Sequence, residues 1–199
     1  LSRIGLTNTV ETFKQFRKNK HLAWFLIAFY LMSDALVTIF AFISLYATQT
    51  LGLSIAEVGT ILIIVQVIGI PSAFLFGWLA DKKGQRKILL VTIVVWILIV
   101  LLLGFGRTKF IMYVVAVLTG LVIGGSQSVA RSWFSNLVPE KKRFGLFGFN
   151  SFASKVSATL GPVLFGAISS FFGSQRIAMF SIAPFLIASW IIFYNIKEK

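Results

Sequence analysis

The sequence predicts an all-α integral membrane protein with six transmembrane helices. Its 199 residues are 57% hydrophobic and 13% charged, and the mean hydropathy is +0.90. Several apolar runs reach the length of about 20 helical residues that crosses a hydrocarbon core of about 30 Å. Because a water-soluble domain of this size could not bury so much apolar surface, lipid is the expected solvent for most of the chain.

Apolar runs separated by charged or glycine-containing turns define the predicted helices. No Lys or Arg occurs between His21 and Lys82, and a turn near Gly52 divides this stretch into two spans. Later runs carry no charge over the length of a whole span. The predicted spans are 22–47, 57–80, 88–106, 110–131, 144–172 and 176–195.

The first 21 residues form a predicted basic segment, cytoplasmic or interfacial, ahead of a six-helix domain at 22–199. Val10, Phe13 and Phe16 would be the apolar anchors of an amphipathic segment lying on the membrane surface. The same segment also fits an interdomain linker.

Basic residues gather on one side of the predicted topology. Six spans put both termini on one side, where fifteen Lys and Arg fall, against three on the other side (Arg107, Lys109 and Arg176). Cytoplasmic loops carry such an excess, so both termini are predicted to be cytoplasmic. The net charge of +13 is therefore interpreted as a topology signal and not as a nucleic-acid-binding surface.

A short repeat suggests that the six helices form two inverted three-helix units. The triplet LFG at 75–77 is followed seven residues later by Gly84, and the same triplet at 164–166 is followed seven residues later by Gly173. The first copy lies on the predicted cytoplasmic side and the second on the outward side, as inverted topology requires. Chance similarity between two glycine turns is the alternative.

The sequence contains no constellation for catalysis, metal binding or cofactor binding. Cysteine is absent, and the single histidine, His21, precedes the first span. Carboxylates are few and scattered, and neither a nucleophile–base pair nor a phosphate-binding glycine loop occurs. We therefore expect no enzyme, no metal and no cofactor.

Two ionisable residues, Asp34 and Lys155, lie inside predicted spans. A charge at the bilayer centre costs about 2.5 to 3.5 kcal/mol on insertion scales, so each needs a partner or a water-filled cavity. Both residues lie near mid-membrane, on spans that start from the same side. Their opposite charges suggest a pair that binds a charged substrate or exchanges a proton; the alternative is a static bridge between two helices.

Other polar residues in the spans would line the same cavity. Gln66 and Gln127 are candidates, although such amides more often join helices by hydrogen bonds. Gly120 and Gly124 have the spacing that lets a neighbouring helix approach closely. Polar residues at helical spacing flank both charges: Tyr30, Asp34 and Thr38 on the first span, and Ser151, Lys155 and Thr159 on the fifth.

Residues 77–87 read GWLADKKGQRK, between the second and third spans. In nearly every position this segment resembles the signature loop of the major facilitator superfamily, G-x-L-x-D-[RK]-x-G-[RKx]-[RK]-[RK]. Its glycine would allow close helix contact, its aspartate would face helix ends, and its basic residues would hold the loop in the cytoplasm. The resemblance implies half of a major facilitator fold and a secondary transporter.

The same resemblance implies a cytoplasmic gate. In that superfamily the loop aspartate belongs to a charge cluster that stabilises the outward-facing state, often with an arginine at the end of the fourth helix. Asp81 matches the aspartate, and Arg131 is placed to match the arginine. The alternative is that the loop only fixes topology. The implied gating residues are Gly77, Asp81, Lys82, Gly84, Arg86, Lys87 and Arg131.

Further segments resemble the vacuolar amino-acid effluxer-like family of permeases. They are residues 130–134 (ARSWF), the Pro139-Glu140 turn, 147–149 (FGF) with Lys155, and 161–166 (GPVLFG). This resemblance implies amino acids or related small metabolites as substrates, and a plasma, inner or vacuolar membrane as the location.

Superfamily members normally have twelve helices in two halves with the substrate between them, whereas six are predicted here. The basic N-terminal segment resembles the linker before the second half, so the chain is interpreted as a C-terminal half. Its implied partners are the lipid bilayer, a small-molecule substrate, and an N-terminal half or a second copy. The competing interpretation is a truncated, non-transporting scaffold or remnant.

Overall fold

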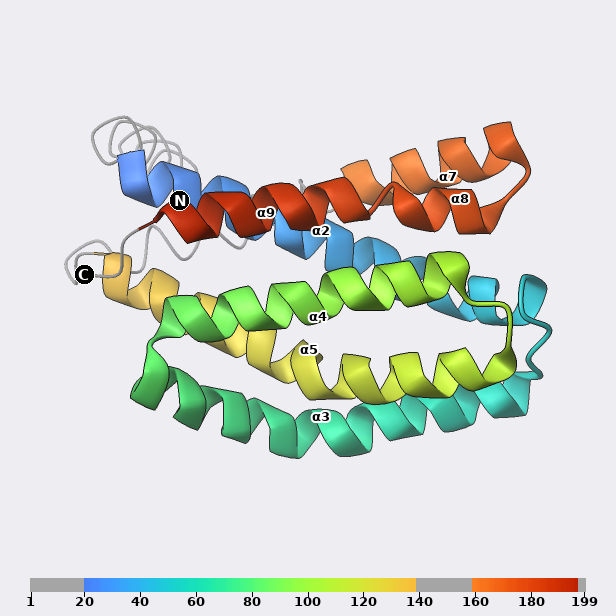
Figure 1. The fold of residues 1–199 in the computed structure, drawn as a ribbon, viewed down its shortest axis with the longest axis horizontal. Helices are drawn as coiled ribbons and strands as arrows, with labels where there is room; N and C mark the ends of the chain where they lie inside the picture. The colour runs from blue at the N-terminus through green and yellow to red at the C-terminus, as the bar shows by residue number, and fades with distance from the viewer. Residues whose placement is uncertain (1–19, 139–158, 197–199) are drawn as a thin grey trace, which may run out of the picture.

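The computed structural model describes residues 20–138 and 159–196, all of them in or between helices (Figure 1). Long helices run back and forth along one axis, and their connections gather at its two ends. Lys20, Lys83 and Lys87 lie at one end, which we call the basic end. The helices are α2 (Lys20–Gln49), α3 (Ile55–Lys83), α4 (Gln85–Phe105), α5 (Lys109–Leu137), α7 (Leu160–Phe172), α8 (Gln175–Phe180) and α9 (Ala183–Asn195).

In the described residues, five helical segments are long and apolar enough to cross a membrane, with α8 and α9 counted as one segment, Gln175–Asn195. The first four predicted spans and the sixth coincide with them, with ends that differ by a few residues. Of the predicted fifth span, the structure describes α7, a shorter apolar helix. Residues 1–19 lie outside the described part, so the basic N-terminal segment stays a prediction.

The sixth predicted span is interrupted where α8 gives way to α9. Pro184 stands in the first turn of α9, and proline has no N–H to continue the helical ladder. The Ala178 carbonyl near the end of α8 accepts both the Ser181 N–H, at 3.1 Å, and the Ser181 hydroxyl, at 2.6 Å. The break is local, because both helices stay on one course along the bundle (Figure 1).

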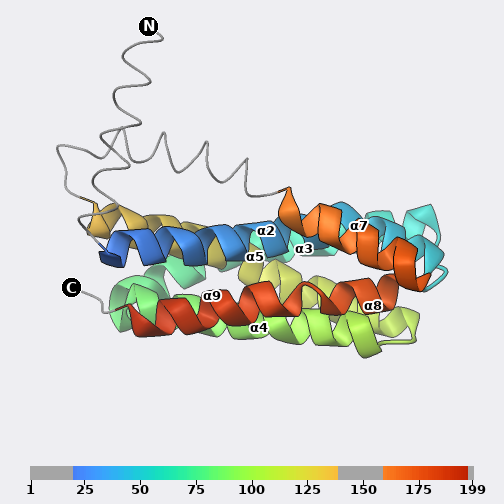
Figure 2. The same cartoon turned by 90° about the horizontal axis from the view of Figure 1, so that it is seen from above.

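The helices pack in two layers that share one apolar core (Figure 2). Helices α4 and α9 lie in one layer, and α2 and α7 lie in the other. The main pairings are α3 with α5, α4 with α5, α2 with α9 and α4 with α9. Large buried side chains fill the space between them, among them Trp96, Trp133, Phe25 and Phe193.

The predicted close approach at Gly120 and Gly124 is confirmed, and the partner is α3. A Cβ atom on Gly120 would lie 2.8 Å from Ile68 Cβ, and one on Gly124 would lie 2.7 Å from Ala73 Cβ. Such distances leave no room for a side chain. The Ser72 hydroxyl lies 2.8 Å from the Gly120 carbonyl and 2.9 Å from the Gly69 carbonyl of its own helix, so its single hydrogen is shared between these two acceptors.

A capping box fixes the start of α3 at the end of the bundle opposite the basic end. The Ser54 hydroxyl accepts from the Glu57 N–H at 3.2 Å, and the Glu57 carboxylate accepts from the Ser54 N–H at 2.6 Å. Glu57 also pairs with Lys109 of α5 at 3.0 Å. Both side chains of this ion pair are partly exposed, so the cap contributes more than the ion pair to holding the helix end.

Candidate functional site

Asp34 occupies the middle of α2 and is 2% exposed. Its Oδ2 atom accepts a hydrogen bond of 2.8 Å from the backbone N–H of Gly161, in the first turn of α7. Its Oδ1 atom has no hydrogen-bond partner among the described residues. A buried carboxylate with one free oxygen is costly unless a cation or a proton meets it, which marks Asp34 as a candidate site.

The start of α7 supplies the partial positive charge that Asp34 needs. The first N–H groups of a helix have no partner within it, and the helix dipole favours an anion there. The side chain of Thr159, at the N-cap position, makes no capping hydrogen bond. Asp34 therefore provides from α2 a capping hydrogen bond at the start of α7, where the Thr159 side chain provides none.

Gly161 is the residue that lets α7 approach so closely. A Cβ atom on Gly161 would lie 2.0 Å from the Thr38 hydroxyl oxygen and 3.0 Å from Asp34 Oδ2. Both distances are shorter than an ordinary van der Waals contact. Any residue with a side chain at this position would force α7 away from α2 and lengthen the hydrogen bond to Asp34.

Tyr30 and Thr38 lie one helical turn before and after Asp34, as the spacing predicted. The Thr38 hydroxyl is buried and donates to the Asp34 backbone carbonyl at 2.7 Å. The Tyr30 hydroxyl oxygen is also buried, without a hydrogen-bond partner among the described residues. Within the described part of the chain, the Tyr30 hydroxyl and Asp34 Oδ1 are therefore two buried polar atoms on one face of α2 without a hydrogen-bond partner.

The other predicted cavity residues have different positions. Ser151 and Lys155 lie outside the described residues, so the pairing of Asp34 with Lys155 stays a prediction. Gln66 on α3 and Gln127 on α5 are exposed, and no hydrogen bond within the described part joins either to Asp34. Tyr30, Asp34 and Thr38 therefore lie together on one face of α2, whereas the two amides lie on exposed surfaces of other helices.

The signature segment is mostly helix and not a loop. Helix α3 continues through Asp81 and Lys82 to Lys83, and Gly84 alone separates it from α4. Gly84 has φ +93°, a backbone conformation that side chains disfavour, so glycine is needed for this sharp reversal. Among the described residues Gly77 makes no close helix contact, because beyond its chain neighbours and local helix backbone no atom lies within 4 Å of a Cβ built there. Its expected role in a gate stays a prediction.

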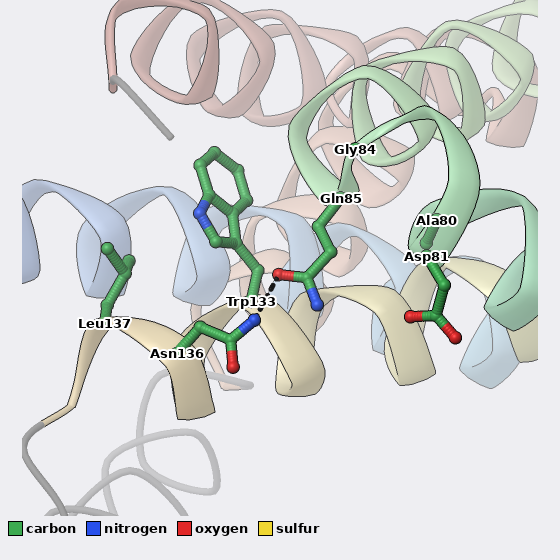
Figure 3. A pocket seen from close by; sticks show the side chains of 7 residues that line it. All are labelled: Ala80, Asp81, Gly84, Gln85, Trp133, Asn136 and Leu137. Atoms are coloured by element: carbon green, nitrogen blue, oxygen red, sulfur yellow. Dashed lines mark hydrogen bonds between the residues drawn. The ribbon is translucent and has the colours of Figure 1, made fainter. Parts of the chain in front are cut away.

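Asp81 lines a pocket of about 300 Å³ at the basic end (Figure 3). The Gln85 amide crosses it, accepting from Asn136 at 3.1 Å and donating to the Ser132 hydroxyl at 2.7 Å. Asp81 and Arg131 are both exposed, and no ion pair joins them among the described residues. The pocket is lined by Ala80, Asp81, Gly84, Gln85, Trp133, Asn136 and Leu137.

Comparison with known protein families identifies the family of this chain. The model of the family described as vacuole effluxer Atg22 like matches residues 2–199. The chain belongs to this family. Together with the apolar helices, this membership makes it an integral, multi-pass membrane protein.

The relatives of this Atg22-like chain are longer than it is. It is 27% identical to an uncharacterized MFS-type transporter, YxiO, of Bacillus subtilis, over 95% of this chain and 44% of the relative. It is 30% identical to autophagy-related protein 22 of Kluyveromyces lactis, over 98% and 42%, and 31% identical to that of Saccharomyces cerevisiae, over 83% and 33%. The chain thus spans less than half the length of these relatives.

Two contacts of the Atg22-like chain were not foreseen from its sequence. Gly161 stands out in the glycine-proline motif, but nothing local links it to Asp34. Arg86, predicted for the gate, stacks on the Tyr194 ring at 5.1 Å and donates to the Tyr194 carbonyl. It therefore joins the start of α4 to the end of α9 and has a structural role at least.

Proposed function

We propose that this Atg22-like chain is one half of a secondary active transporter that moves a small metabolite by alternating access. Membership of the effluxer family supports this function, and so does the similarity to an MFS-type transporter. Because the chain spans less than half of its relatives, its partner would be an N-terminal half or a second copy. Amino acids are the substrate class to test first.

The pairing of the helices supports two inverted three-helix repeats. Exchanging α2 with α5, α3 with α7, and α4 with α8 and α9 maps the principal helix contacts onto one another. The α3–α5 pair corresponds to α2–α7, the α4–α5 pair to α2–α9, and the α3–α4 pair to α7–α8. Repeats of this kind put the substrate site at their interface near the bilayer midplane, which is the region of Asp34.

A pair of equivalent contacts supports the same division. Ser72 and Gly161 each lie three residues before the repeated LFG triplet. Ser72 bonds to α5 through its hydroxyl at 2.8 Å, and Gly161 bonds to Asp34 of α2 through its N–H at 2.8 Å. Equivalent positions therefore contact equivalent helices, which supports the repeat over a chance match between two glycine turns.

The proposed mechanism rests on the buried carboxylate of Asp34. Its free Oδ1 atom and the Tyr30 hydroxyl would receive a charged group of the substrate or a coupling ion, with Lys155 as the proposed counter-charge. Gln66 and Gln127, exposed on α3 and α5, would line the rest of a cavity closed by the partner half. Ser151 and Thr38 complete the proposed lining.

The proposed gate lies at the basic end, which we assign to the cytoplasm because Lys and Arg concentrate there. Asp81 and Arg131 are exposed; Asp81 lies two residues before the end of α3, and Arg131 lies six residues before the end of α5. They are accessible to a second half that closes against this end. In this proposal their charges act between the halves and bind no substrate.

The test is flux of labelled amino acids in proteoliposomes, with this chain alone and with a candidate N-terminal half. We expect flux only when a partner half is present, because half of the site is missing otherwise. Asp34→Asn and Lys155→Ala should each abolish it. Ser44→Ala is a matched control, because Ser44 is an exposed polar residue on the same helix.

Three outcomes separate the interpretations. Loss of flux in either variant with normal protein yield supports the mid-membrane site. Flux that is unchanged by both substitutions would indicate that Asp34 only caps α7, through its hydrogen bond with Gly161. Absence of flux in every preparation, with all amino acids tried, would favour a non-transporting scaffold.

A further inference from the structure

The exposed face of α3 changes from apolar to basic along the helix. Val67, Ile70, Phe74 and Trp78 are 64%, 66%, 77% and 53% exposed, and Lys82 continues the row as an exposed residue. Their spacing of three or four residues places them on one side of the helix. We call these five residues the α3 stripe. It runs from aliphatic side chains through an aromatic ring to a positive charge.

The length of the stripe matches one leaflet of a bilayer. Val67 and Trp78 are eleven residues apart, so they are separated by about 16 Å along the helix axis. Half of a hydrocarbon core of about 30 Å is about 15 Å. If Val67 lies near the midplane, Trp78 lies at the interface, where tryptophan is enriched, and Lys82 lies one turn beyond it among the headgroups.

The charge at the end of the stripe is held in position. The Lys82 ammonium lies 4.0 Å from the centre of the Trp78 ring, in a cation–π contact. This contact holds the ammonium over the Trp78 ring, at the polar end of the α3 stripe. A free lysine would instead spread its charge over many positions in water.

More positive charge surrounds Lys82. Positions 81–87 contain four basic residues and one acidic residue, Asp81. Lys83 and Lys87 are exposed, whereas Arg86 is bound to Tyr194. Three lysines therefore remain to meet an anion at the level where the apolar stripe ends.

We propose that the α3 stripe with Lys82, Lys83 and Lys87 is a binding site for an anionic phospholipid. One acyl chain lies along Val67, Ile70 and Phe74, and the lysines bind the headgroup phosphate. Helix α3 forms an edge of the bundle, with α4 and α5 on its inner side (Figure 1). Charge complementarity selects an anionic lipid over a neutral one, with about 1 kcal/mol for each lysine near the surface.

The lipid face adjoins the face proposed for transport but has a different centre on α3. Gln66 and Val67 are consecutive, so their side chains point about 100° apart around α3. A partner half that meets Gln66 can therefore leave Val67, Phe74 and Trp78 open to lipid. Ile70, four residues after Gln66, lies at the border between the two faces. The lipid site does not depend on the transport proposal, because it needs neither Asp34 nor a substrate.

The test is quenching of Trp78 fluorescence by lipids with brominated acyl chains. The full chain is placed in vesicles of phosphatidylcholine mixed with phosphatidylserine, and the brominated chains are carried by one lipid or by the other. The contribution of Trp78 is the difference from the Trp78→Phe variant. We expect brominated phosphatidylserine to quench Trp78 more than brominated phosphatidylcholine at equal content.

Variants of Lys82 identify the cause of this preference. Lys82→Gln should lower the preference for phosphatidylserine by about fivefold, and Lys82→Arg should keep it, because arginine retains the charge and the ring contact. Arg107→Gln is the matched control, since Arg107 is an exposed basic residue at the other end of the bundle. It should leave the preference unchanged.

Several results would overturn the site. Equal quenching by the two lipids in the unchanged chain would show no headgroup selection. Absence of any Trp78 quenching would mean that protein, not lipid, covers the stripe. Removal of the preference by inorganic phosphate added to the vesicles would indicate a site for free phosphate.

Discussion

The contact between Gly161 and α2 gives the sharpest prediction, through Gly161→Ala. The new Cβ atom would stand 2.0 Å from the Thr38 hydroxyl oxygen and 3.0 Å from Asp34 Oδ2. Thr38 cannot turn away without loss, because it is fully buried and bonds to the Asp34 carbonyl at 2.7 Å. Either that hydrogen bond breaks or α7 moves outward.

The expected cost follows from these contacts. Overpacking of a tight core costs about 1–3 kcal/mol, and a hydrogen bond to a charged group contributes about 1.5–3 kcal/mol, of which a displaced α7 loses part. Alanine recovers up to about 1 kcal/mol of helix propensity over glycine. We therefore expect a loss of about 2 kcal/mol in the free energy of unfolding, or about 4–8 °C in Tm.

The assay is thermal unfolding in detergent, followed by tryptophan fluorescence, with Gly166→Ala as a matched control. Gly166 lies on the same helix, and beyond its chain neighbours and local helix backbone no atom lies within 4 Å of a Cβ atom built on it. Its substitution should therefore be neutral or slightly stabilising. Thr38→Ala combined with Gly161→Ala should recover part of the lost stability. Equal Tm values for the two glycine variants, or no recovery in the double variant, would refute the steric argument.

Substitutions at three positions test the same framework by thermal unfolding. Asp34→Ala should cost about 1–3 kcal/mol more than Asp34→Asn, because asparagine keeps an oxygen for the Gly161 N–H; equal losses would count against the cap. Ser72→Ala should cost about 1 kcal/mol through the hydrogen bond to the Gly120 carbonyl, and an unchanged Tm would contradict that assignment. Ser54→Ala should cost about 1 kcal/mol by removing the N-cap of α3, whereas Ser54→Thr should retain most of it; identical behaviour of the two would argue against the capping box.

Much of the fold could be predicted from the sequence because hydropathy is a local property. Each span is a run of apolar residues long enough for the bilayer, and the charges that end the runs stand beside them in the chain. The spacing of Gly120 and Gly124 likewise predicts that another helix packs closely against this face, and the structure confirms it. The break between α8 and α9 was missed, because Pro184 can also be accommodated within a continuous apolar span.

The candidate site was predictable only in part. Asp34 stood out because a carboxylate inside an apolar run is costly, and its neighbours Tyr30 and Thr38 followed from helical spacing. The exposure of Gln66 and Gln127 depends on how the helices are rotated against one another, which spacing alone does not fix. For Gly77, a signature that resembles a family motif suggested a helix contact that the described chain does not make.

The sequence by itself determined that lipid surrounds most of the chain, where most of the spans lie, and at which end of the bundle positive charge is concentrated. Each follows from properties summed over neighbouring residues. Only the tertiary structure showed that Asp34 accepts a hydrogen bond from the N–H of Gly161, 127 residues away. Every residue except proline has such a backbone donor, so the side-chain pattern of a sequence does not indicate which one will be used. It also decided that Lys82 folds over Trp78 at the end of an open stripe, since exposure and side-chain direction depend on how the helices pack.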